Sequence, residues 1–327
     1  MNSKNTYPYN SLFLAGPTAA GKTSVAIELA KRLNGEVITV DSAQVYRGMD
    51  IGTAKPSIEQ RDGVVHHLID VQDVHKPFNV SLFLEHVELI LRDMETRGVF
   101  PIFAGGTGLY FQALYEGLPT TPPSQPSVRN RLELLQTADL YQLLLIKDPA
   151  YAKTITSNDR NKIIRANEIL IITQKKVSDF QERTKSDRLK TLNPKAFFIY
   201  RPREVLYERL NLRAKQMCEN GLIDEVQALV QKGIELNVSA KKAISYQQPL
   251  KYLKGEVSYE KMLQELQQAN RQYAKRQFTW FKRMEYFCQV NLEEIGETTF
   301  VDLVLKEFFL PNHEAKSELS SPPLVRP

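Results

Sequence analysis

Eight consecutive residues near the N-terminus have the types and spacing of a phosphate-binding loop. They read Gly-Pro-Thr-Ala-Ala-Gly-Lys-Thr and fit the pattern G-x-x-x-x-G-K-S/T. In such a loop, backbone N–H groups and the positive end of the next helix face the phosphate, and the lysine ammonium adds a full charge. The threonine hydroxyl is then free to bind Mg²⁺. We therefore expect a phosphate group to be held by Gly16, Pro17, Thr18, Ala19, Ala20, Gly21, Lys22 and Thr23.

The segments on either side of this loop indicate the elements that must position it. Leu12 to Ala15 is a short apolar run typical of a buried strand, and Ser24 to Leu33 carries apolar residues at helical spacing. Strand, glycine loop and helix therefore follow in the order that phosphate binding requires. The alternative is a glycine-rich turn that only joins a strand to a helix. That alternative would not explain why the pattern, the lysine and both flanking elements all agree with a phosphate-binding loop.

Two further segments place polar side chains where predicted strands end. Glu36 to Val40 reads as a strand that ends at Asp41, and Val99 to Ala104 reads as a buried strand that runs into a Gly-Gly-Thr turn at Thr107. The carboxyl ends of parallel strands border the ligand crevice of an open sheet. We therefore expect the phosphate loop, Asp41 and Thr107 to face one another.

Asp41 is the acid that this arrangement leaves for chemistry. NTP-hydrolysing proteins and kinases usually carry a magnesium-directing aspartate at the end of a core strand, but the strand Val99 to Ala104 ends without a carboxylate. Asp41 could help to hold Mg²⁺ or accept a proton from an incoming nucleophile. The alternative is that Asp41 only caps the next helix, and Thr107 likewise could serve only to start one.

Composition limits the class of protein. The chain has 327 residues, a mean hydropathy of −0.35, no long apolar run and a polar N-terminus, which together predict a soluble cytoplasmic protein without a membrane span. Its two cysteines form no C-x-x-C pattern, and its five histidines show no zinc-type spacing. The metal that we expect is therefore Mg²⁺ on phosphate.

Positive charge gathers in one stretch, although the whole chain carries only +5. Between Lys241 and Arg283 there are ten lysines and arginines against three glutamates. Within the predicted helix from Ala269 to Arg283, Lys275 and Arg276 alternate with aromatic residues, a mixture that suits a nucleic-acid surface. The alternative is that the aromatic residues follow core spacing and that only the cations face outward.

A second pair of cations has helical spacing. Arg209 and Arg213 lie four residues apart in the predicted helix from Glu204 to Gln216, hence on one face, where they could clamp a phosphate. Solvated charge on a helix surface is the common alternative.

The order of the predicted elements gives the fold and the domains. We expect an α/β protein with a P-loop core, in which helices flank a parallel sheet, plus an all-helical insertion domain. A proline-rich break from Leu118 to Pro126 precedes the insertion, and the apolar run Ala196 to Tyr200 returns to strand character. The predicted core is therefore 1–118 and 196–311, the insertion is 119–195, and the tail 312–327 is predicted to be disordered.

Several separate stretches together resemble one family, the tRNA dimethylallyltransferases, also called tRNA isopentenyltransferases. The phosphate loop is similar to the family's diphosphate loop, and VDSAQVYRGMDIGTAKP, residues 40–56, is close to its most distinctive stretch. The stretches VVHHLID, GGTGLYFQAL and YAKRQFTWF follow in the family's order. The resemblance spans about residues 12 to 283.

The resemblance implies transfer of a dimethylallyl group from dimethylallyl diphosphate to N6 of adenine 37 in tRNA. The loop would then hold an isoprenoid diphosphate, with its charge neutralised by Lys22, Arg213 and a Mg²⁺ held partly by Thr23. By the same analogy, Asp41 is the general base and Thr107 a hydrogen-bonding catalytic residue. The pocket for the flipped nucleotide would be lined by Asp41, Ser42, Ala43, Gln44 and Thr107.

The resemblance also implies that the helical insertion grips the anticodon stem-loop. The tRNA contacts that it implies are Arg129, Asn161, Lys162, Ile163, Ile164, Arg165, Lys275 and Arg276. The chain departs from the family at three places. Asn161 and Lys162 stand where the family usually has Gln-Arg, Ser245-Tyr246-Gln247-Gln248 stands for Gly-Tyr-Arg-Gln, and Gly108 replaces a methionine-like residue.

Three other functions use parts of the same pattern. An isopentenyltransferase of free adenine nucleotides would share the loop and Asp41 without RNA-gripping surfaces, and an ATP-dependent small-molecule kinase would share the loop. An RNA-binding relative without catalysis would keep only the surfaces. The helical insertion and the positive charge from Lys241 to Arg283 favour the RNA-modifying function. The expected partners are a tRNA anticodon stem-loop and dimethylallyl diphosphate, with no membrane, and the expected state is a monomer.

Overall fold

The computed structural model describes residues 9–180 and 182–309, so the predicted tail 312–327 lies outside the described residues. The chain divides into two compact units. The core unit is Met1–Gln112 with Thr191–Pro327, and the helical unit is Ala113–Lys190. Both divisions come a few residues earlier in the chain than the boundaries at 118 and 195 that the sequence suggested.

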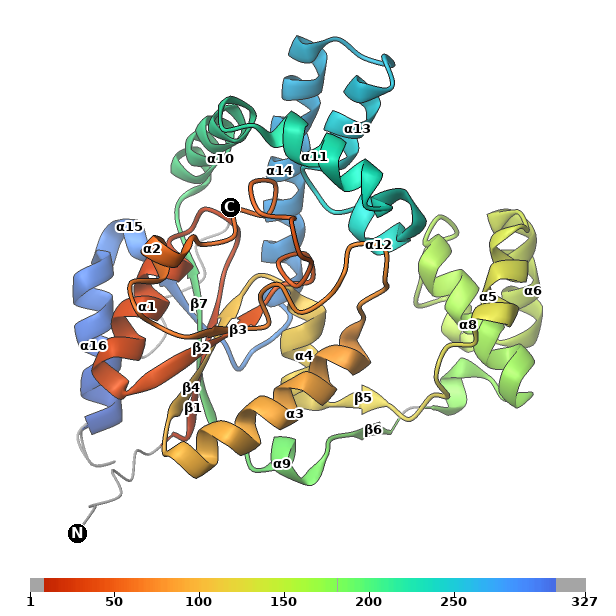
Figure 1. Ribbon diagram of the computed structural model, residues 1–327. Helices are drawn as coiled ribbons and strands as arrows, with labels where there is room; N and C mark the ends of the chain where they lie inside the picture. The colour runs from red at the N-terminus through yellow and green to blue at the C-terminus, as the bar shows by residue number, and fades with distance from the viewer. Residues whose placement is uncertain (1–8, 181, 310–327) are drawn as a thin grey trace. The chain divides into compact units, whose positions relative to one another are not determined.

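A six-stranded sheet forms the centre of the core unit (Figure 1). Its strands are Ser11–Ala15 (β1), Gly35–Val40 (β2), His66–His67 (β3), Phe100–Gly105 (β4), Pro194–Tyr200 (β7) and Cys288–Asn291 (β8). They lie in the order β3-β2-β4-β1-β7-β8, and every pair is parallel. The predicted parallel sheet is confirmed, and so is the return of the chain to it after the insertion.

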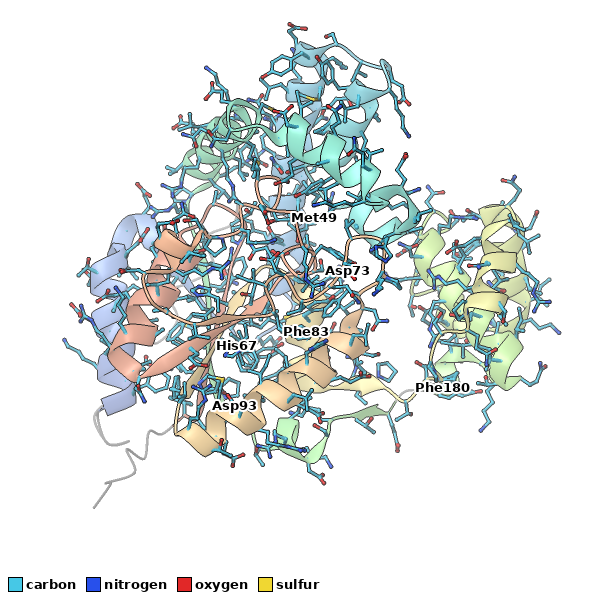
Figure 2. All side chains as sticks on the ribbon, in the orientation of Figure 1. Met49, His67, Asp73, Phe83, Asp93 and Phe180 are labelled. Carbon is cyan, nitrogen blue, oxygen red and sulfur yellow. The ribbon has the colours of Figure 1, made fainter. Side chains whose placement is uncertain are left out.

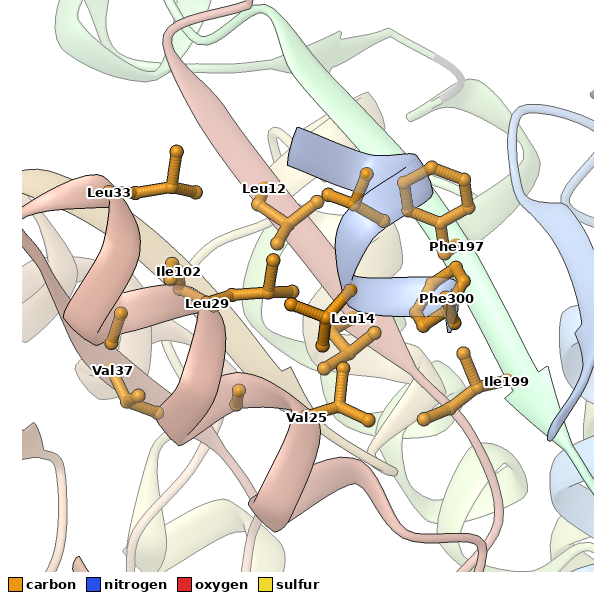
Figure 3. Packing of buried hydrophobic residues seen from close by; sticks show 14 of the residues in the cluster. Leu12, Leu14, Val25, Leu29, Leu33, Val37, Ile102, Phe197, Ile199 and Phe300 are labelled. Atoms are coloured by element: carbon orange, nitrogen blue, oxygen red, sulfur yellow. The ribbon is translucent and has the colours of Figure 1, made fainter. Parts of the chain in front are cut away.

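Both faces of this sheet are buried, which explains why its strands are continuous apolar runs. Leu12 and Leu14 point to one face, where they join a cluster with Leu29 of the first helix and Phe300 of the last (Figure 3). Phe13 points to the other face and packs against the ring of Phe103, with 5.1 Å between the two ring centroids. Each such fully buried side chain contributes about 2 kcal/mol to stability.

Helices cover the sheet and extend the core unit beyond it. They are Lys22–Leu33 (α1), Ile58–Arg61 (α2), Val80–Arg97 (α3), Gly108–Glu116 (α4), Arg203–Glu219 (α10), Leu222–Gln231 (α11), Ile234–Leu236 (η2), Val238–Lys241 (α12), Gln247–Leu253 (α13), Tyr259–Phe281 (α14), Leu292–Ile295 (α15) and Glu297–Phe309 (α16). The boundary with the helical unit falls inside α4. The helix predicted from Ala269 begins ten residues earlier, at Tyr259, and ends at Phe281.

Three strand ends meet at one point of the sheet. In the register of the sheet, Gly105 pairs with both Ala15 and Val40, so the ends of β1, β4 and β2 line up as predicted. A Cβ added to Gly105 would lie 2.1 Å from the carbonyl oxygen of Val40, and one added to Gly16 would lie 2.3 Å from that of Ile199. Glycine is therefore required where the backbones approach this closely.

The helical unit has its own core. Its elements are Leu118–Pro119 (β5), Pro126–Glu133 (α5), Thr137–Lys147 (α6), Pro149–Ala152 (α7), Arg160–Thr173 (α8), Val177–Asp179 (η1), Arg183–Thr184 (β6) and Asp187–Lys190 (α9). Apolar side chains of α5, α6 and α8 pack together. The short antiparallel pair of β5 and β6 corrects the prediction of an all-helical insertion.

Candidate functional site

The predicted phosphate loop runs from the end of β1 into the first turn of α1. Ala19 and Gly21 have positive φ angles, of 66° and 107°, and left-handed residues of this kind occur in anion-binding nests of backbone N–H groups. The Lys22 ammonium donates a hydrogen bond to the carbonyl oxygen of Pro17 at 2.7 Å, and Thr23 lies exposed in the first helical turn. The loop is thus shaped for an anion before any anion binds.

Both arginines of α10 contact this loop. Arg213 donates to the hydroxyl of Thr18 at 2.9 Å, and Arg209 donates to the carbonyl oxygen of Ala19, also at 2.9 Å. Both acceptors are neutral, so the guanidinium charges are not cancelled by these contacts. The two arginines therefore share one helix face, as their spacing predicted, and that face meets the loop; a phosphate clamp by the pair stays a prediction.

The charges around Lys22 affect one another strongly. Burial and the neighbouring Arg213 lower the pKa of Lys22 to about 7, although Asp41 acts in the opposite direction. Burial also lowers the pKa of Arg213 to about 10, again opposed by Asp41. Two cations are therefore held close together with one carboxylate nearby, an arrangement that an incoming diphosphate would relieve.

Asp41 follows β2 and organises the turn after it. Its Oδ1 accepts hydrogen bonds from the backbone N–H groups of Ala43 at 2.8 Å and Gln44 at 3.2 Å. The carboxylate therefore caps a turn, whereas the next helix, α2, begins only at Ile58. Because these contacts use Oδ1, the capping and the catalytic interpretations of Asp41 are compatible.

Thr107, which follows β4, is hydrogen-bonded to Ser42, the residue after Asp41. Its Oγ1 accepts a hydrogen bond from the backbone N–H of Ser42 at 3.1 Å, and its carbonyl oxygen accepts from Tyr110 in the first turn of α4. The backbone of Thr107 therefore starts helix α4, while its side chain bonds to the turn after Asp41. The strand register confirms that the strand ends before the loop, Asp41 and Thr107 line up; that the three groups face one ligand stays a prediction.

Helix α14 supplies two side chains to this edge that the sequence did not single out for it. Burial and the nearby Asp41 raise the pKa of the Tyr273 hydroxyl well above its usual value, while Thr107 acts in the opposite direction. Gln277, one turn later, bonds to both the phosphate loop and the Gly-Gly-Thr turn. A polar residue at a core-spaced position in an apolar stripe was the signal that could have revealed Gln277.

The distinctive stretch 40–56 is an irregular segment fixed by buried polar contacts. The Lys55 side chain is only 4% exposed and pairs with Asp50 and Asp70. From α11, the carboxylate of Glu225 accepts the backbone N–H groups of Asp50, Ile51 and Gly52. Figure 2 shows Met49 and Asp73, side chains of this region of the core unit. The turn at Asp41 therefore continues into a rigid segment.

The basic part of α14 presents its cations outward. Lys275 and Arg276 are exposed, and the Arg276 guanidinium lies 5.6 Å from the centroid of the Tyr273 ring. Phe281 is buried, whereas 38% of Trp280 is exposed. Core packing therefore explains only some of the aromatic residues of this stretch, and the cations remain on the surface.

In the helical unit, the predicted arginines serve a buried carboxylate. Glu168 of α8 is fully buried and accepts from Ser124 and Arg165, the latter at 2.7 Å. Arg165 also donates to the carbonyl oxygen of Pro122, and Arg129 lies 3.9 Å from Glu168. Burial acts to raise the pKa of Glu168, but hydrogen bonds from Ser124, Arg165 and the backbone N–H of Gln125 outweigh it and lower that pKa.

Two residues of the predicted RNA-contacting stretch are placed elsewhere. The side chains of Ile163 and Ile164 are 0% and 2% exposed and belong to the core of the helical unit. The expectation that they offer side chains to tRNA is corrected, because helical periodicity turns them inward. Asn161 and Lys162 are exposed on the same helix, and Lys162 pairs with Asp159 at 2.8 Å.

Two departures from the family pattern have structural consequences. Ser245, where the family usually has glycine, adopts a φ of 79° while only 2% exposed. A side chain in this left-handed region costs about 1 kcal/mol relative to glycine. At Gly108, an added Cβ would lie 2.2 Å from the indole of Trp280, so Trp280 occupies the space that a larger residue would need.

The described residues include neither a cluster of metal ligands nor a membrane-spanning helix. Within 9–180 and 182–309, there is no group of three or more His, Cys, Asp or Glu side chains that could hold a metal ion by themselves. No helix in those ranges is long and apolar enough to cross a bilayer.

Comparison with family models matches residues 44–284 to the model described as IPP transferase and residues 10–77 to that described as Isopentenyl transferase. Among curated proteins, the chain is 42% identical to a tRNA dimethylallyltransferase of Protochlamydia amoebophila over 306 residues, 91% of this chain and 89% of the relative. It is 38% identical to one of Syntrophomonas wolfei, over 91% of this chain and 96% of the relative.

Solved structures agree with these sequence relatives. A tRNA isopentenylpyrophosphate transferase of Bacillus halodurans is 35% identical and superposes with a TM-score of 0.68, covering 91% of this chain and 97% of the other. A eukaryotic dimethylallyltransferase acting on tRNA is 25% identical with a TM-score of 0.75, covering 90% of this chain and 78% of the other. The P-loop-like core and the parallel sheet are thus shared with these enzymes.

Proposed function

Because the chain belongs to the IPP transferase family, the tRNA dimethylallyltransferases, we propose that it transfers a dimethylallyl group from dimethylallyl diphosphate to tRNA. The acceptor that we propose is N6 of adenosine 37, beside the anticodon. One structural observation carries the proposal. A G-x-x-x-x-G-K-T loop next to the basic groups of Lys22 and Arg213, whose hydrogen-bond acceptors are neutral, shares one sheet edge with the acid Asp41 and with Thr107.

The diphosphate of the donor would lie in the loop Gly16 to Thr23. Backbone N–H groups, Lys22 and Arg213 would stabilise the negative charge that grows on the leaving diphosphate. Mg²⁺ would supply further charge neutralisation there when bound, with the Thr23 hydroxyl as its protein ligand. Mg²⁺ that is bound mainly by phosphate oxygens commonly takes only one or two protein ligands, so a single hydroxyl from Thr23 would suffice.

The acceptor adenine would lie against the turn after β2. The N6 nitrogen would attack the allylic carbon, the bond from that carbon to the diphosphate oxygen would break, and the diphosphate would leave with the electron pair. Asp41 would take the proton that N6 loses, while Thr107 hydrogen-bonds the base or the diphosphate. Ser42, Ala43 and Gln44 would line the pocket for the nucleotide flipped out of its loop.

Contacts to the rest of the tRNA would come from exposed polar side chains. We propose Lys275 and Arg276 of the core unit, together with Asn161 and Lys162 of the helical unit, as contacts to the anticodon stem-loop. The half-buried Arg129 and Arg165 would contribute mainly by holding Glu168 in place. We further propose that the protein acts as a cytoplasmic monomer.

The test is a transfer assay with three acceptors. The full chain is incubated with Mg²⁺, dimethylallyl diphosphate and an anticodon stem-loop with adenosine at position 37, and in parallel with AMP and with ATP. Mass spectrometry should detect prenylated RNA only, and a stem-loop with guanosine at that position is the control. Prenylated AMP or ATP would show a free-nucleotide enzyme, while bound but unmodified stem-loop would show an RNA-binding protein without catalysis.

A further inference from the structure

One buried side chain joins the two halves of the candidate site. Gln277 of α14 is 5% exposed, and its Oε1 accepts a hydrogen bond from the backbone N–H of Thr18 at 3.2 Å. Its Nε2 donates to the carbonyl oxygen of Gly106 at 2.9 Å. The amide therefore uses its acceptor on the phosphate loop and its donor on the Gly-Gly-Thr turn.

The fit around this amide is close. A Cβ added to Gly106 would lie 2.2 Å from Nε2 of Gln277 and 3.2 Å from the carbonyl oxygen of Gly16. The N–H of Gly106 is itself bonded to the carbonyl oxygen of Val40. The strand ends, the loop and the amide are therefore closely packed. A change at Gln277 would shift both the phosphate loop and the Gly-Gly-Thr turn.

The helix that carries Gln277 is firmly anchored in the core unit. Phe281, one turn later, stacks on Phe198 with 5.0 Å between ring centroids, and Ala274 packs among side chains of α10. Helix α14 thus contacts the Gly-Gly-Thr turn at Gly106 and the loop at Thr18 through Gln277.

We propose that Gln277 is a positioning residue that sets the distance and direction between the diphosphate loop and the Asp41–Thr107 turn. The inference rests on the proposed function, in which those two elements hold the donor and the acceptor. Transfer requires N6 and the allylic carbon to approach within about 3.5 Å in line with the leaving oxygen. Gln277 touches neither substrate and acts through the backbone that each one binds.

The first test is Gln277→Met, which keeps the length of the side chain and removes both hydrogen bonds. A misplacement of about 1 Å at a reacting centre costs about 100-fold, so we expect the single-turnover rate to fall by that order. The dissociation constants of dimethylallyl diphosphate and of the stem-loop, measured separately, should change less than threefold. The matched control is Gln264→Met on the exposed side of the same helix, which should behave as wild type.

The second test uses Gln277→Glu, which keeps the size and shape of the side chain and changes only its hydrogen-bonding groups. The carboxylate cannot donate to Gly106, but the protonated acid can. The rate of this variant relative to wild type should therefore rise as the pH falls from 8 to 6. If the site needs only a side chain that fills the core at position 277, the ratio of the two rates would not depend on pH.

The outcomes separate the two proposals. If the wild type gives no prenylated RNA, the proposed function fails. If the wild type is active and Gln277→Met is equally active, the positioning role fails. That role also fails if both dissociation constants rise in step with the loss of rate, or if the Gln277→Glu ratio does not depend on pH.

Discussion

Arginines of the two units have the same predicted task, contact with phosphate, but different partners. In the core unit, Arg209 and Arg213 donate to a neutral carbonyl and a neutral hydroxyl of the phosphate loop. In the helical unit, Arg165 and Arg129 face the fully buried carboxylate of Glu168. An arginine bound to neutral acceptors keeps its charge for a ligand, whereas one paired with a buried carboxylate contributes mainly to the fold.

The largest expected effect lies in the core unit, at Asp41. Asp41→Asn keeps an oxygen that can accept from Ala43 and Gln44, so the turn should stay intact while the base is lost. We expect the single-turnover rate of transfer to fall about 1000-fold. The dissociation constant of the stem-loop should change less than threefold. A large loss of RNA affinity would mean that Asp41 serves binding or folding instead.

The next effect lies in the helical unit, at Arg165. Arg165→Ala leaves the buried Glu168 carboxylate without its closest cation, which should lower the free energy of unfolding by about 3 kcal/mol. Hydrogen exchange of residues 113–190 in increasing urea measures it. Arg131→Ala, an exposed arginine of α5, is the matched control and should change stability by less than about 0.5 kcal/mol. Equal stability of both variants would remove the distinction between the two regions.

A smaller effect should appear in the pH dependence of donor binding. The pKa of Lys22 is lowered to about 7 in the free protein, so above that pH the lysine is mostly neutral. A bound diphosphate favours the charged form, and binding must then take up a proton. We expect the affinity for dimethylallyl diphosphate to fall by up to about tenfold per pH unit between pH 7.5 and 9.5. Calorimetry of wild type and Lys22→Met checks this, and a flat profile for wild type would contradict it.

The smallest effect concerns an exposed cation of the helical unit. Lys162 pairs only at the surface with Asp159, so Lys162→Met should leave stability unchanged. It should weaken stem-loop binding about threefold and reduce the slope of log affinity against log salt by about one. Lys153→Met, another exposed lysine of this unit, is the control for general charge loss. An unchanged slope in Lys162→Met would show that Lys162 makes no phosphate contact.

Sequence reasoning was accurate where neighbouring residues decide the structure. The bounds of β1, β2, β4 and β7 differ from the predicted strands by one or two residues. The phosphate loop was recognisable because its diagnostic residue types and spacing all lie within residues 16 to 23. The prediction of tRNA contacts was wrong for the side chains of Ile163 and Ile164, because a family resemblance does not say which side of a helix faces the core.

The sequence by itself determined the strand segments, the phosphate loop and the position of Asp41 at a strand end, since the residue pattern within each segment specifies them. The parallel sheet followed from the alternation of strands and helices, although its pairs join distant segments such as β1 and β7. Only the tertiary structure decided which distant groups complete that edge. Arg213 meets Thr18 across 195 residues of chain, and Gln277 meets it across 259. Such pairings depend on how whole helices pack, and the spacing of residues along one helix carries no information about the partner that its polar side chains will find.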